Sequence, residues 1–294
     1  MRISLIHNQA SGRRVALASL RALIEREGHE LVRVIEHSAD ASRVADPPAE
    51  LVVAAGGDGT IADAIRATAG RDVPLAVLPL GTANNIAFGL GLGGPIEDQV
   101  RSWHTAQTRP FDIGLLQGAG IDRKFVEGVG GGLVEACMTS IRRRPMRGGE
   151  PPPWQLVRAL KRYAQTLRRL RPRRWTLRLD GEIREDEFLL VEVLNTRAVG
   201  PNLDLAPHAT PADGALTVVT ARESDRSALA AYIDDRLAGR DGRLALPSER
   251  TRCVDVLDAD VLHVDDELLR VTPGSAVSIR LQAAAVNVLV PPPA

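Results

Sequence analysis

The sequence predicts an α/β fold with two domains, a doubly wound parallel sheet followed by a mainly antiparallel β-sandwich. Over residues 1–110, apolar runs of strand length alternate with segments of helical periodicity, as a doubly wound sheet requires. From about residue 111 the pattern changes to short apolar runs separated by turn residues, which is typical of antiparallel strands. A chain of 294 residues is also long enough to form two domains of ordinary size.

Three strands of the first domain are each expected to end in a small or polar loop that opens a helix. In an open parallel sheet, ligands bind beyond the carboxyl ends of the strands, so these loops are expected to meet at one ligand. The first helix is expected over about residues 13–26. The strands cover residues 2–7, 51–55 and 74–80, and the loops after them are 8–12 (NQASG), 56–60 (GGDGT) and 81–85 (GTANN).

The loop 56–60 has the composition of a phosphate-binding turn. Its three glycines let the backbone approach a ligand without a Cβ clash, and the helix after it directs N–H groups and its positive dipole end at the turn. Asp58 would repel phosphates unless a cation lay between them, which favours a nucleotide bound with Mg²⁺. A plain strand-to-helix turn would also contain such glycines, and the loop matches neither the Rossmann nor the Walker pattern.

The second domain is expected to be β-rich, with one long helical insertion. Asp180–Gly181 is a candidate for a hairpin turn, because this dipeptide adopts the backbone that two-residue hairpin loops need. The insertion covers about residues 142–174. The expected strands are 112–116, 124–129, 175–180, 188–194, 215–219, 261–264, 276–279 and 286–290.

The net charge is zero, but the insertion is strongly basic. Residues 142–174 contain 12 Lys and Arg and one acid, Glu150, which gives a local charge of +11. Their basic residues include Arg144, Arg147 and Arg168, and apolar residues recur near helical spacing after Trp154. An anionic membrane surface would suit such a helix, whereas a helix that packs on its own domain would show the same pattern. We expect the helix itself to pack on its own domain, and we expect the cluster of basic residues to be attracted to an anionic membrane surface.

The remaining composition indicates an ordinary globular protein. Two cysteines, Cys137 and Cys253, provide no disulfide framework and indicate a reducing compartment. The first residues open directly into a strand, and no apolar run is long enough to span a bilayer. We therefore expect a cytoplasmic protein that associates peripherally with the membrane. Nucleic acid is not an expected partner because aromatic residues are scarce, and a homodimer is kept as an option.

The three loops resemble the motifs of lipid kinases of the diacylglycerol-kinase and sphingosine-kinase type, and above all the small bacterial, YegS-like branch. GGDGT alone is shared with NAD kinases, whereas its combination with GTANN and a C-terminal acidic element is more specific. The resemblance runs in order over nearly the whole chain. It also covers residues 111–114 (FDIG), 125–132, 206–207, 211–216 and 265–267, where DDE stands in place of the family's Asp-Gly-Glu.

The resemblance implies ATP and Mg²⁺ as cofactors and an active site between the domains. It divides the chain into a nucleotide-binding domain of residues 1–110, to which 285–294 return, and a substrate domain of residues 111–284. Asp58 would hold Mg²⁺, directly or through water. The residues implied at the nucleotide are Asn8, Ser11, Gly12, Gly56, Gly57, Asp58, Gly59, Thr60, Gly81, Thr82 and Asn84.

For the catalytic base the resemblance favours Glu267, with Asp265 beside it. In extended backbone the two side chains would lie on one face of the strand. Two carboxylates so near each other would raise the pKa of one of them, which would make it a stronger base. A plain acidic turn between two strands is the alternative. The resemblance also implies a structural metal site formed by Asp213 with the carbonyls of Thr210 and Ala215, where an ordinary turn is the alternative.

The sequence departs from the family pattern at several positions. Asp266 replaces the usual Gly of the acidic element, Asn85 replaces Asp, and Phe88 stands where Arg is common. Ala62 and Asp63 replace Asn and Glu, and Ile35 lies near the position where relatives have a nucleotide-contacting Thr.

The expected function is phosphorylation of a lipid hydroxyl, such as that of diacylglycerol or a long-chain base. Two alternatives stay open. One is a kinase of this fold acting on a soluble hydroxyl, including an NAD-kinase-like role, and the other is a non-catalytic nucleotide-binding membrane sensor.

Overall fold

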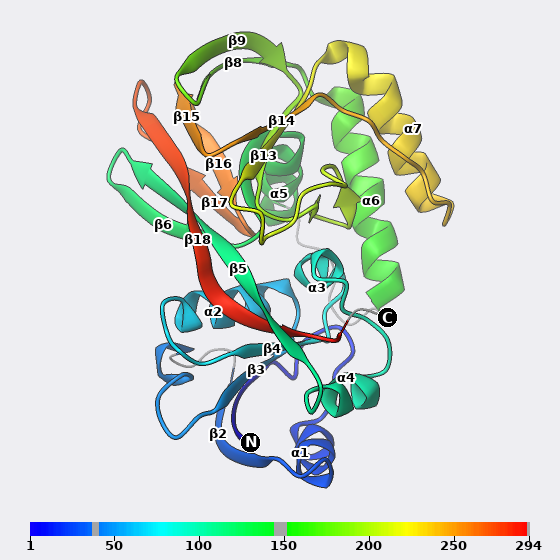
Figure 1. Ribbon diagram of the computed structural model, residues 1–294. Helices are drawn as coiled ribbons and strands as arrows, with labels where there is room; N and C mark the ends of the chain where they lie inside the picture. Colours follow the sequence, from blue (N-terminus) through cyan, green and yellow to red (C-terminus); the bar gives the residue numbers. More distant parts are fainter. Residues whose placement is uncertain (37–40, 144–151, 293–294) are drawn as a thin grey trace. The chain divides into compact units, whose positions relative to one another are not determined.

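The structure is a computed structural model that describes residues 1–36, 41–143 and 152–292 (Figure 1). The chain forms two compact units, and both are built from separated segments. Unit 1 comprises Met1–Ile113, Thr210–Ala212 and Ala283–Ala294, and unit 2 comprises Gly114–Ala209 and Asp213–Gln282. The predicted fold class, a parallel sheet domain and an antiparallel β-sandwich, is confirmed.

Unit 1 is built on a parallel sheet in the order β2-β1-β3-β4. Its central strand β3 is buried along its whole length, as expected of a strand covered on both faces. The C-terminal part of β18 adds to β4 in parallel, with Val288 opposite Leu75. The elements are β1 Arg2–His7, α1 Leu17–Arg26, β2 Glu30–Glu36, η1 Ala41–Arg43, β3 Leu51–Gly56, α2 Asp58–Thr68, β4 Leu75–Pro79, α3 Asn85–Gly89 and α4 Ile96–Ser102.

Two helices of unit 1 begin elsewhere than predicted. The helix expected from about residue 13 begins at Leu17, because the preceding turn holds Arg14 at φ 47°, which is not helical backbone. The helix after GGDGT begins at Asp58, so the motif itself forms the first helical turn.

Unit 2 contains two facing antiparallel layers. One is the six-stranded sheet β14-β13-β10-β7-β16-β17, and the other has the order β18-β15-β8-β9. Val191, Val193 and Val218 of the first pack with Trp175, Leu177 and Val254 of the second in one apolar core. The strands are β5 Gln107–Gly118, β6 Ile121–Phe125, β7 Gly128–Gly132, β8 Arg173–Leu179, β9 Glu182–Phe188, β10 Leu190–Leu194, β11 Ala198–Val199, β12 Leu203–Asp204, β13 Leu216–Ala221, β14 Ser248–Thr251, β15 Cys253–Leu257, β16 Val261–Val264, β17 Glu267–Arg270 and β18 Ala276–Val290.

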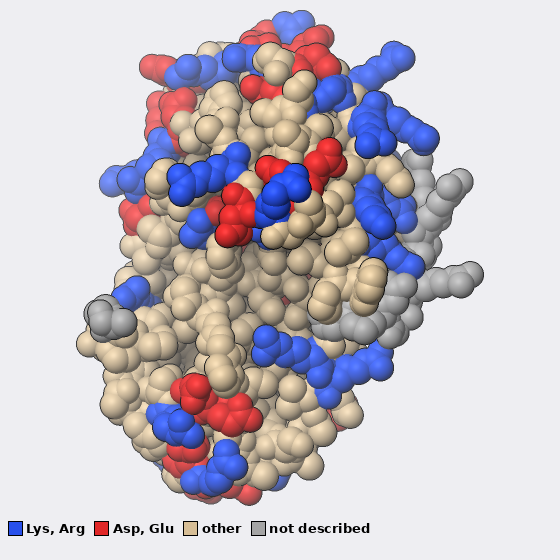
Figure 2. Space-filling view, turned by 90° about the vertical axis from the view of Figure 1, so that its right-hand side faces the viewer, with Lys and Arg blue, Asp and Glu red and all other residues tan. Residues whose placement is uncertain are grey.

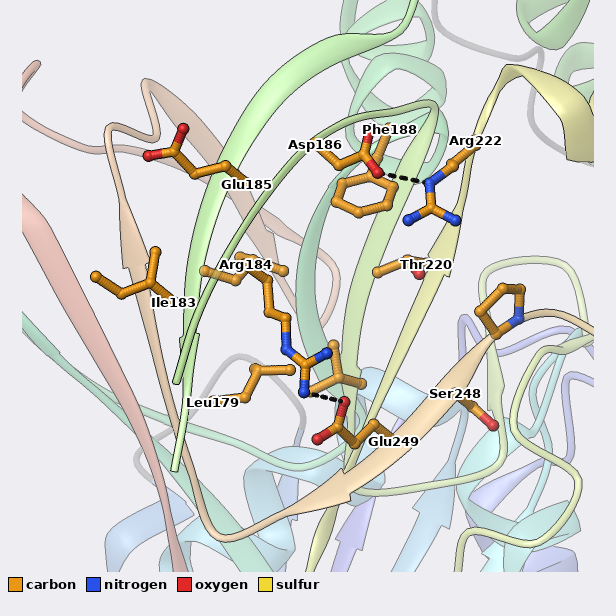
Figure 3. Close-up of a pocket in the computed structure, with 13 residues that line it drawn as sticks. Leu179, Ile183, Arg184, Glu185, Asp186, Phe188, Thr220, Arg222, Ser248 and Glu249 are labelled. Carbon is orange, nitrogen blue, oxygen red and sulfur yellow. Dashed lines mark hydrogen bonds and ion pairs between the residues drawn. The ribbon is translucent and has the colours of Figure 1, made fainter. Parts of the chain in front are cut away.

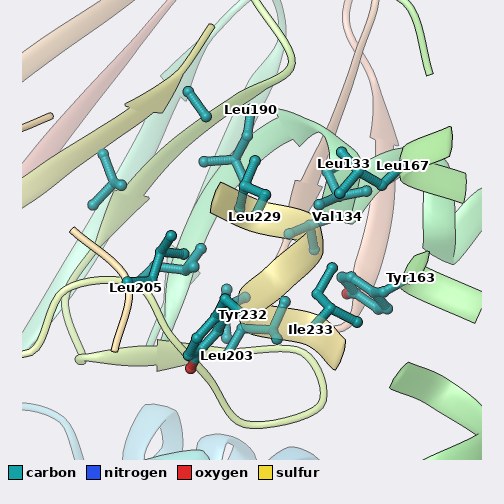
Figure 4. Packing of buried hydrophobic residues seen from close by; sticks show 14 of the residues in the cluster. Leu133, Val134, Tyr163, Leu167, Leu190, Leu203, Leu205, Leu229, Tyr232 and Ile233 are labelled. Carbon is teal, nitrogen blue, oxygen red and sulfur yellow. The ribbon is translucent and has the colours of Figure 1, made fainter. Parts of the chain in front are cut away.

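Three helices cover the outer face of the six-stranded sheet: α5 Leu133–Arg143, α6 Pro152–Arg169 and α7 Arg226–Leu237; the short η2 Glu223–Asp225 precedes α7. Figure 4 shows Tyr163 and Leu167 of α6 among Leu190 and the residues of α7 in this second core. The apolar side of α6 is therefore used for packing, as expected for the helix itself. Arg144, Arg147 and Glu150 of the basic insertion lie outside the described residues.

The charged side of α6 faces solvent. Lys161, Arg168 and Arg169 are exposed, and the indole of Trp154 at the start of the helix is 65% exposed. Figure 2 looks at the side on which Figure 1 draws α6 and α7, and Lys and Arg side chains stand out from that surface. Among the described residues, no helix is both long enough and apolar enough to cross a bilayer.

The Asp180–Gly181 hairpin is confirmed, and both residues have positive φ, 45° and 99°, as its turn type requires. Other boundaries differ from the prediction. The strand expected over 124–129 is split between β6 and β7, while the two strands expected after residue 276 are the single strand β18. The prediction did not include α5, α7, β9, β14, β15 or β17.

Candidate active site

The three polar loops of unit 1 meet beyond the carboxyl ends of β1, β3 and β4, as predicted. The Asn8 side-chain amide donates to Thr60 Oγ1 at 3.3 Å, and the Gly57 N–H donates to Ser11 Oγ at 3.2 Å. The Arg13 N–H donates to the Leu80 carbonyl at 2.9 Å. Each of the three loops is thus tied to another by a hydrogen bond.

Glycine is required where the loops touch. A Cβ at Gly81 would lie 2.5 Å from the Gly57 Cα, so the two loops pack backbone against backbone. A Cβ at Gly56 would lie 2.5 Å from the Thr60 side chain, which is buried. These two motif glycines are therefore needed for close packing.

Asp58 joins the second loop to the third. Its Oδ1 accepts the Ile86 N–H at 3.1 Å, so the carboxylate stands at the N-terminus of α3. Burial raises the pKa of Asp58 from 3.8 to about 6, although hydrogen bonds from the backbone of Ile86, Asn84 and Asn85 oppose the shift. The sequence predicted Asp58 beside a phosphate. In the structure its carboxylate also connects the second loop to the start of α3.

Asn84 closes the third loop on itself. It lies in the left-handed region at φ 56°, its Oδ1 accepts the Gly81 N–H at 2.8 Å, and its side-chain amide donates to the Gly81 carbonyl at 3.2 Å. Helix α2 begins beside this loop, and its N-cap residue Gly57 has no side chain with which to cap it. Backbone N–H groups, more than motif side chains, are therefore suited to bind an anion here.

The loop cluster fits a magnesium ion that arrives with a nucleotide. The described residues contain no group of three or more His, Cys, Asp or Glu side chains that could hold a metal ion. Mg²⁺ commonly binds through one or two carboxylates together with substrate phosphates, and Asp58 supplies one carboxylate at these loops.

In unit 2 the acidic element is a two-residue turn between β16 and β17. Val264 pairs with Glu267, and Asp265 occupies the left-handed region at φ 51°. The extended backbone expected over residues 265–267 is therefore not present, because the chain reverses at Asp265 and Asp266. The turn is tight although Asp266 replaces the family's Gly.

The two acids of this turn have different surroundings. Asp265 accepts the N–H groups of Val126, Glu127 and Gly128 at 2.8–3.3 Å, so three donors stabilise its ionised carboxylate. The Glu267 side chain is 63% exposed and lies 3.8 Å from the Arg123 guanidinium. Asp265 is thus held in place, while Glu267 is open to a reactant.

Asp213, the expected metal ligand, has a cationic neighbour of its own. Its carboxylate accepts the Ala215 N–H at 3.1 Å and lies 2.9 Å from the Arg250 guanidinium. Arg250 supplies the positive charge that the resemblance assigns to a metal. The metal site of Asp213, Thr210 and Ala215 stays a prediction, and these contacts do not favour it.

The structure shows the surroundings of the residues that depart from the family pattern. Ile35 and Ala62 are buried, Asp63 pairs with Arg66 at 2.9 Å, and Asn85 is buried at the start of α3. The Phe88 side chain is 47% exposed.

Sequence reasoning missed a buried ionisable pair behind the acidic turn. Glu192 of β10 and His263 of β16 are fully buried, with Oε2 and Nε2 2.7 Å apart. One signal was present, since Glu192 interrupts the apolar run LLVEVL on the side of Leu190 and Leu194. The sequence could not show that Glu192 pairs with His263, because the two residues are 71 positions apart in the chain.

A cavity of about 440 Å³ in unit 2 contains none of the predicted site residues. It opens between the β8–β9 hairpin and β13–β14 (Figure 3). Its lining combines apolar residues such as Leu179 and Phe188 with two ion pairs, Arg184–Glu249 and Asp186–Arg222.

Comparison with known proteins assigns the chain to a family. Residues 2–116 match the diacylglycerol kinase catalytic domain, and residues 155–290 match the YegS C-terminal NAD kinase beta sandwich-like domain. A diacylglycerol kinase of Mycobacterium tuberculosis is 31% identical over 78% of this chain and 75% of its own length. The chain belongs to the diacylglycerol kinase family. A diacylglycerol kinase of Bacillus subtilis is 28% identical over 95% of this chain and 93% of its own length.

The diacylglycerol kinase fold is also found by structural comparison. A crystal structure of a diacylglycerol kinase from Bacillus anthracis superposes with a TM-score of 0.72 at 19% identity, covering 98% of this chain and 96% of that one. The family models and the relatives confirm the resemblance stated from the sequence motifs.

Proposed function

We propose that this protein is an ATP- and Mg²⁺-dependent lipid kinase that phosphorylates the hydroxyl of a lipid such as diacylglycerol or a long-chain base. Family membership supports a kinase that uses ATP. The observation that carries the proposal is the contact of the Gly57 and Gly81 loops at the start of α2, which gathers uncapped helix N–H groups for phosphates.

The proposed roles follow the chemistry of phosphoryl transfer, which needs bound phosphates, neutralised charge and a base near the acceptor. The loops around Ser11, Gly57 and Gly81 bind the nucleotide. Asp58 binds Mg²⁺, which neutralises phosphate charge when bound. Glu267, exposed on its turn, accepts the proton of the acceptor hydroxyl, and Asp265 keeps that turn in place.

We also propose that unit 2 meets the lipid at an anionic membrane surface through α6. Its exposed Lys161, Arg168 and Arg169 offer positive charge, and Trp154 is available at the interface. The apolar side of α6 stays in the core, so the attraction is electrostatic and does not require the helix to insert.

The test is transfer of labelled phosphate from ATP with Mg²⁺ into a bacterial lipid extract in mixed micelles. Glu267→Gln should lower kcat by about 100-fold or more if it is the base. Asp266→Asn is the matched control, because it removes the neighbouring exposed acid of the same turn and should leave kcat within about threefold. Normal turnover by Glu267→Gln would remove Glu267 as the base.

The same assay separates the alternatives. Label in a soluble acceptor such as NAD, with none in lipid, would support a kinase for soluble hydroxyls. Binding of ATP without transfer to either would support a nucleotide-binding sensor.

A further inference from the structure

Glu192, Gly130 and His263 form a row across three neighbouring strands of the six-stranded sheet. In the register, Gly130 of β7 lies opposite Glu192 of β10 on one side and His263 of β16 on the other. A Cβ at Gly130 would lie 2.4 Å from Glu192 Oε2, so glycine there leaves the space in which the two side chains meet. The central strand thus permits a buried contact between its two neighbours.

The imidazole of His263 connects this pair to the acidic turn. Its Nε2 lies 2.7 Å from Glu192 Oε2, and its Nδ1 lies 3.2 Å from the backbone carbonyl of Asp265. A carbonyl oxygen only accepts, so Nδ1 must carry a proton and donate to it. The contact with Glu192 then holds one further proton, on the imidazole or on the carboxyl, and in either form the pair is neutral overall.

The surroundings of the pair favour retention of that proton. Burial raises the pKa of Glu192. Burial alone would lower the pKa of His263, but the Glu192 charge and the hydrogen bonds outweigh it and raise that pKa. Besides its own two members, the group that acts on the pair is Asp265 at the turn, while Glu192 in turn acts on Tyr163 of α6, together with Cys137 of α5 and Glu127 before β7. Burial also raises the pKa values of Tyr163 and Cys137, which stay neutral and so add no charge near the pair.

We propose that Glu192 and His263 are positioning residues that set the geometry of the Asp265–Glu267 turn from inside the sheet. Glu192 orients the imidazole, the imidazole holds the Asp265 carbonyl, and Asp265 in turn holds the N–H groups of residues 126–128. The chain of contacts ends two residues before Glu267. Its catalytic consequence rests on the proposed function.

The test compares two amides that differ by one methylene. In His263→Asn the side-chain amide lies near the Nδ1 position and keeps a donor for the Asp265 carbonyl, while the contact with Glu192 is lost. In His263→Gln the amide reaches Glu192, and the Asp265 carbonyl loses its donor. Leu190→Ala, on the same strand and side as Glu192, controls for loss of buried packing.

Amide hydrogen exchange at Val126, Glu127 and Gly128 provides a measure that does not need activity. We expect exchange in His263→Gln to be at least about tenfold faster than in His263→Asn and Leu190→Ala. If transfer activity is present, kcat of His263→Gln should fall about tenfold or more while the KM for ATP is unchanged. If wild-type protein transfers no phosphate, the proposed function fails, and exchange still tests the positioning role.

Glu192→Gln provides a second variant of the same shape. Its amide can donate to a neutral imidazole, so exchange and kcat should stay within about threefold of wild type. The proposal is overturned if His263→Gln and His263→Asn behave alike, or if Glu192→Gln causes the losses expected of His263→Gln.

Discussion

At the scale of single residues, the polar side chains of loops 8–12, 56–60 and 81–85 hold these loops in shape. Asn8 binds Thr60 and Ser11 binds the Gly57 N–H between two loops, while Asn84 binds Gly81 within the third loop. Conformation at these positions is therefore fixed without a ligand, and the loops are preorganised for whatever anion binds.

Asp58 makes the stability of unit 1 depend on pH. Its pKa is raised from 3.8 to about 6, so the folded state binds a proton more tightly than the unfolded state, and stability falls as pH rises through this window. We expect Asp58→Asn, which does not titrate, to gain stability relative to wild type from pH 4 to pH 6 by at most about 3 kcal/mol. Urea unfolding at several pH values measures this, with Asp63→Asn on the same helix as the control. A difference that is constant with pH would contradict it.

Gly81→Ala should separate the two nucleotide loops. The new methyl group would meet the Gly57 Cα at 2.5 Å, and backbone cannot move aside as a side-chain end can. ATP affinity, measured by calorimetry, should fall about tenfold or more. Gly93→Ala is the matched control, since nothing lies within 4 Å of its Cβ position. Equal affinities in the two variants would show that the loop contact does not shape the site.

At the scale of elements, β7 shows why a glycine-rich strand lies in the middle of a sheet. Glycine usually weakens a strand, but Gly130 leaves room for the Glu192–His263 contact. We expect Gly130→Ala to lower the free energy of unfolding by about 2 kcal/mol or more, because its Cβ would also meet the Val191 carbonyl at 2.3 Å.

Gly128→Ala, on the same side of β7, is the comparison for that substitution. Its first obstacle is the end of the Leu194 side chain at 2.7 Å, which can rotate. Urea denaturation should therefore give a smaller loss than for Gly130→Ala, and the reverse order would contradict the packing argument.

Elements of unit 1 were predictable because their signals are local. The buried run 51–55 and the glycines after it identify a strand and a loop without knowledge of the rest of the fold. Elements of unit 2 depended on distant partners. Strand β15 takes its place by pairing with β8, and α7 packs through Leu229, Tyr232 and Ile233 against residues far away in sequence. The acidic turn was mispredicted as extended for the same reason, since neighbouring strands decide where the chain reverses.

At the scale of the whole molecule, the proposed membrane contact depends on the exposed charge of α6. We expect reversal of Lys161, Arg168 and Arg169 to Glu to reduce partition onto vesicles rich in phosphatidylserine by at least about tenfold, since each basic residue contributes about 1 kcal/mol near such a surface. Sedimentation of the vesicles measures this. Reversal of the exposed Arg21, Arg26 and Arg101 on α1 and α4 is the charge-matched control. Equal losses in the two triple variants would assign binding to total charge and not to α6.

The strand β18 has a consequence for how the protein is made. Its first half pairs with β15 in unit 2, and its second half completes the sheet of unit 1 beside β4. On the ribosome, residues 283–290 emerge only after the segments of unit 2 that precede them, so the edge of β4 that they cover stays open while unit 2 is being synthesised. The sheet of unit 1 is thus completed by a strand that follows unit 2 in the sequence, although most of unit 1 is translated before unit 2.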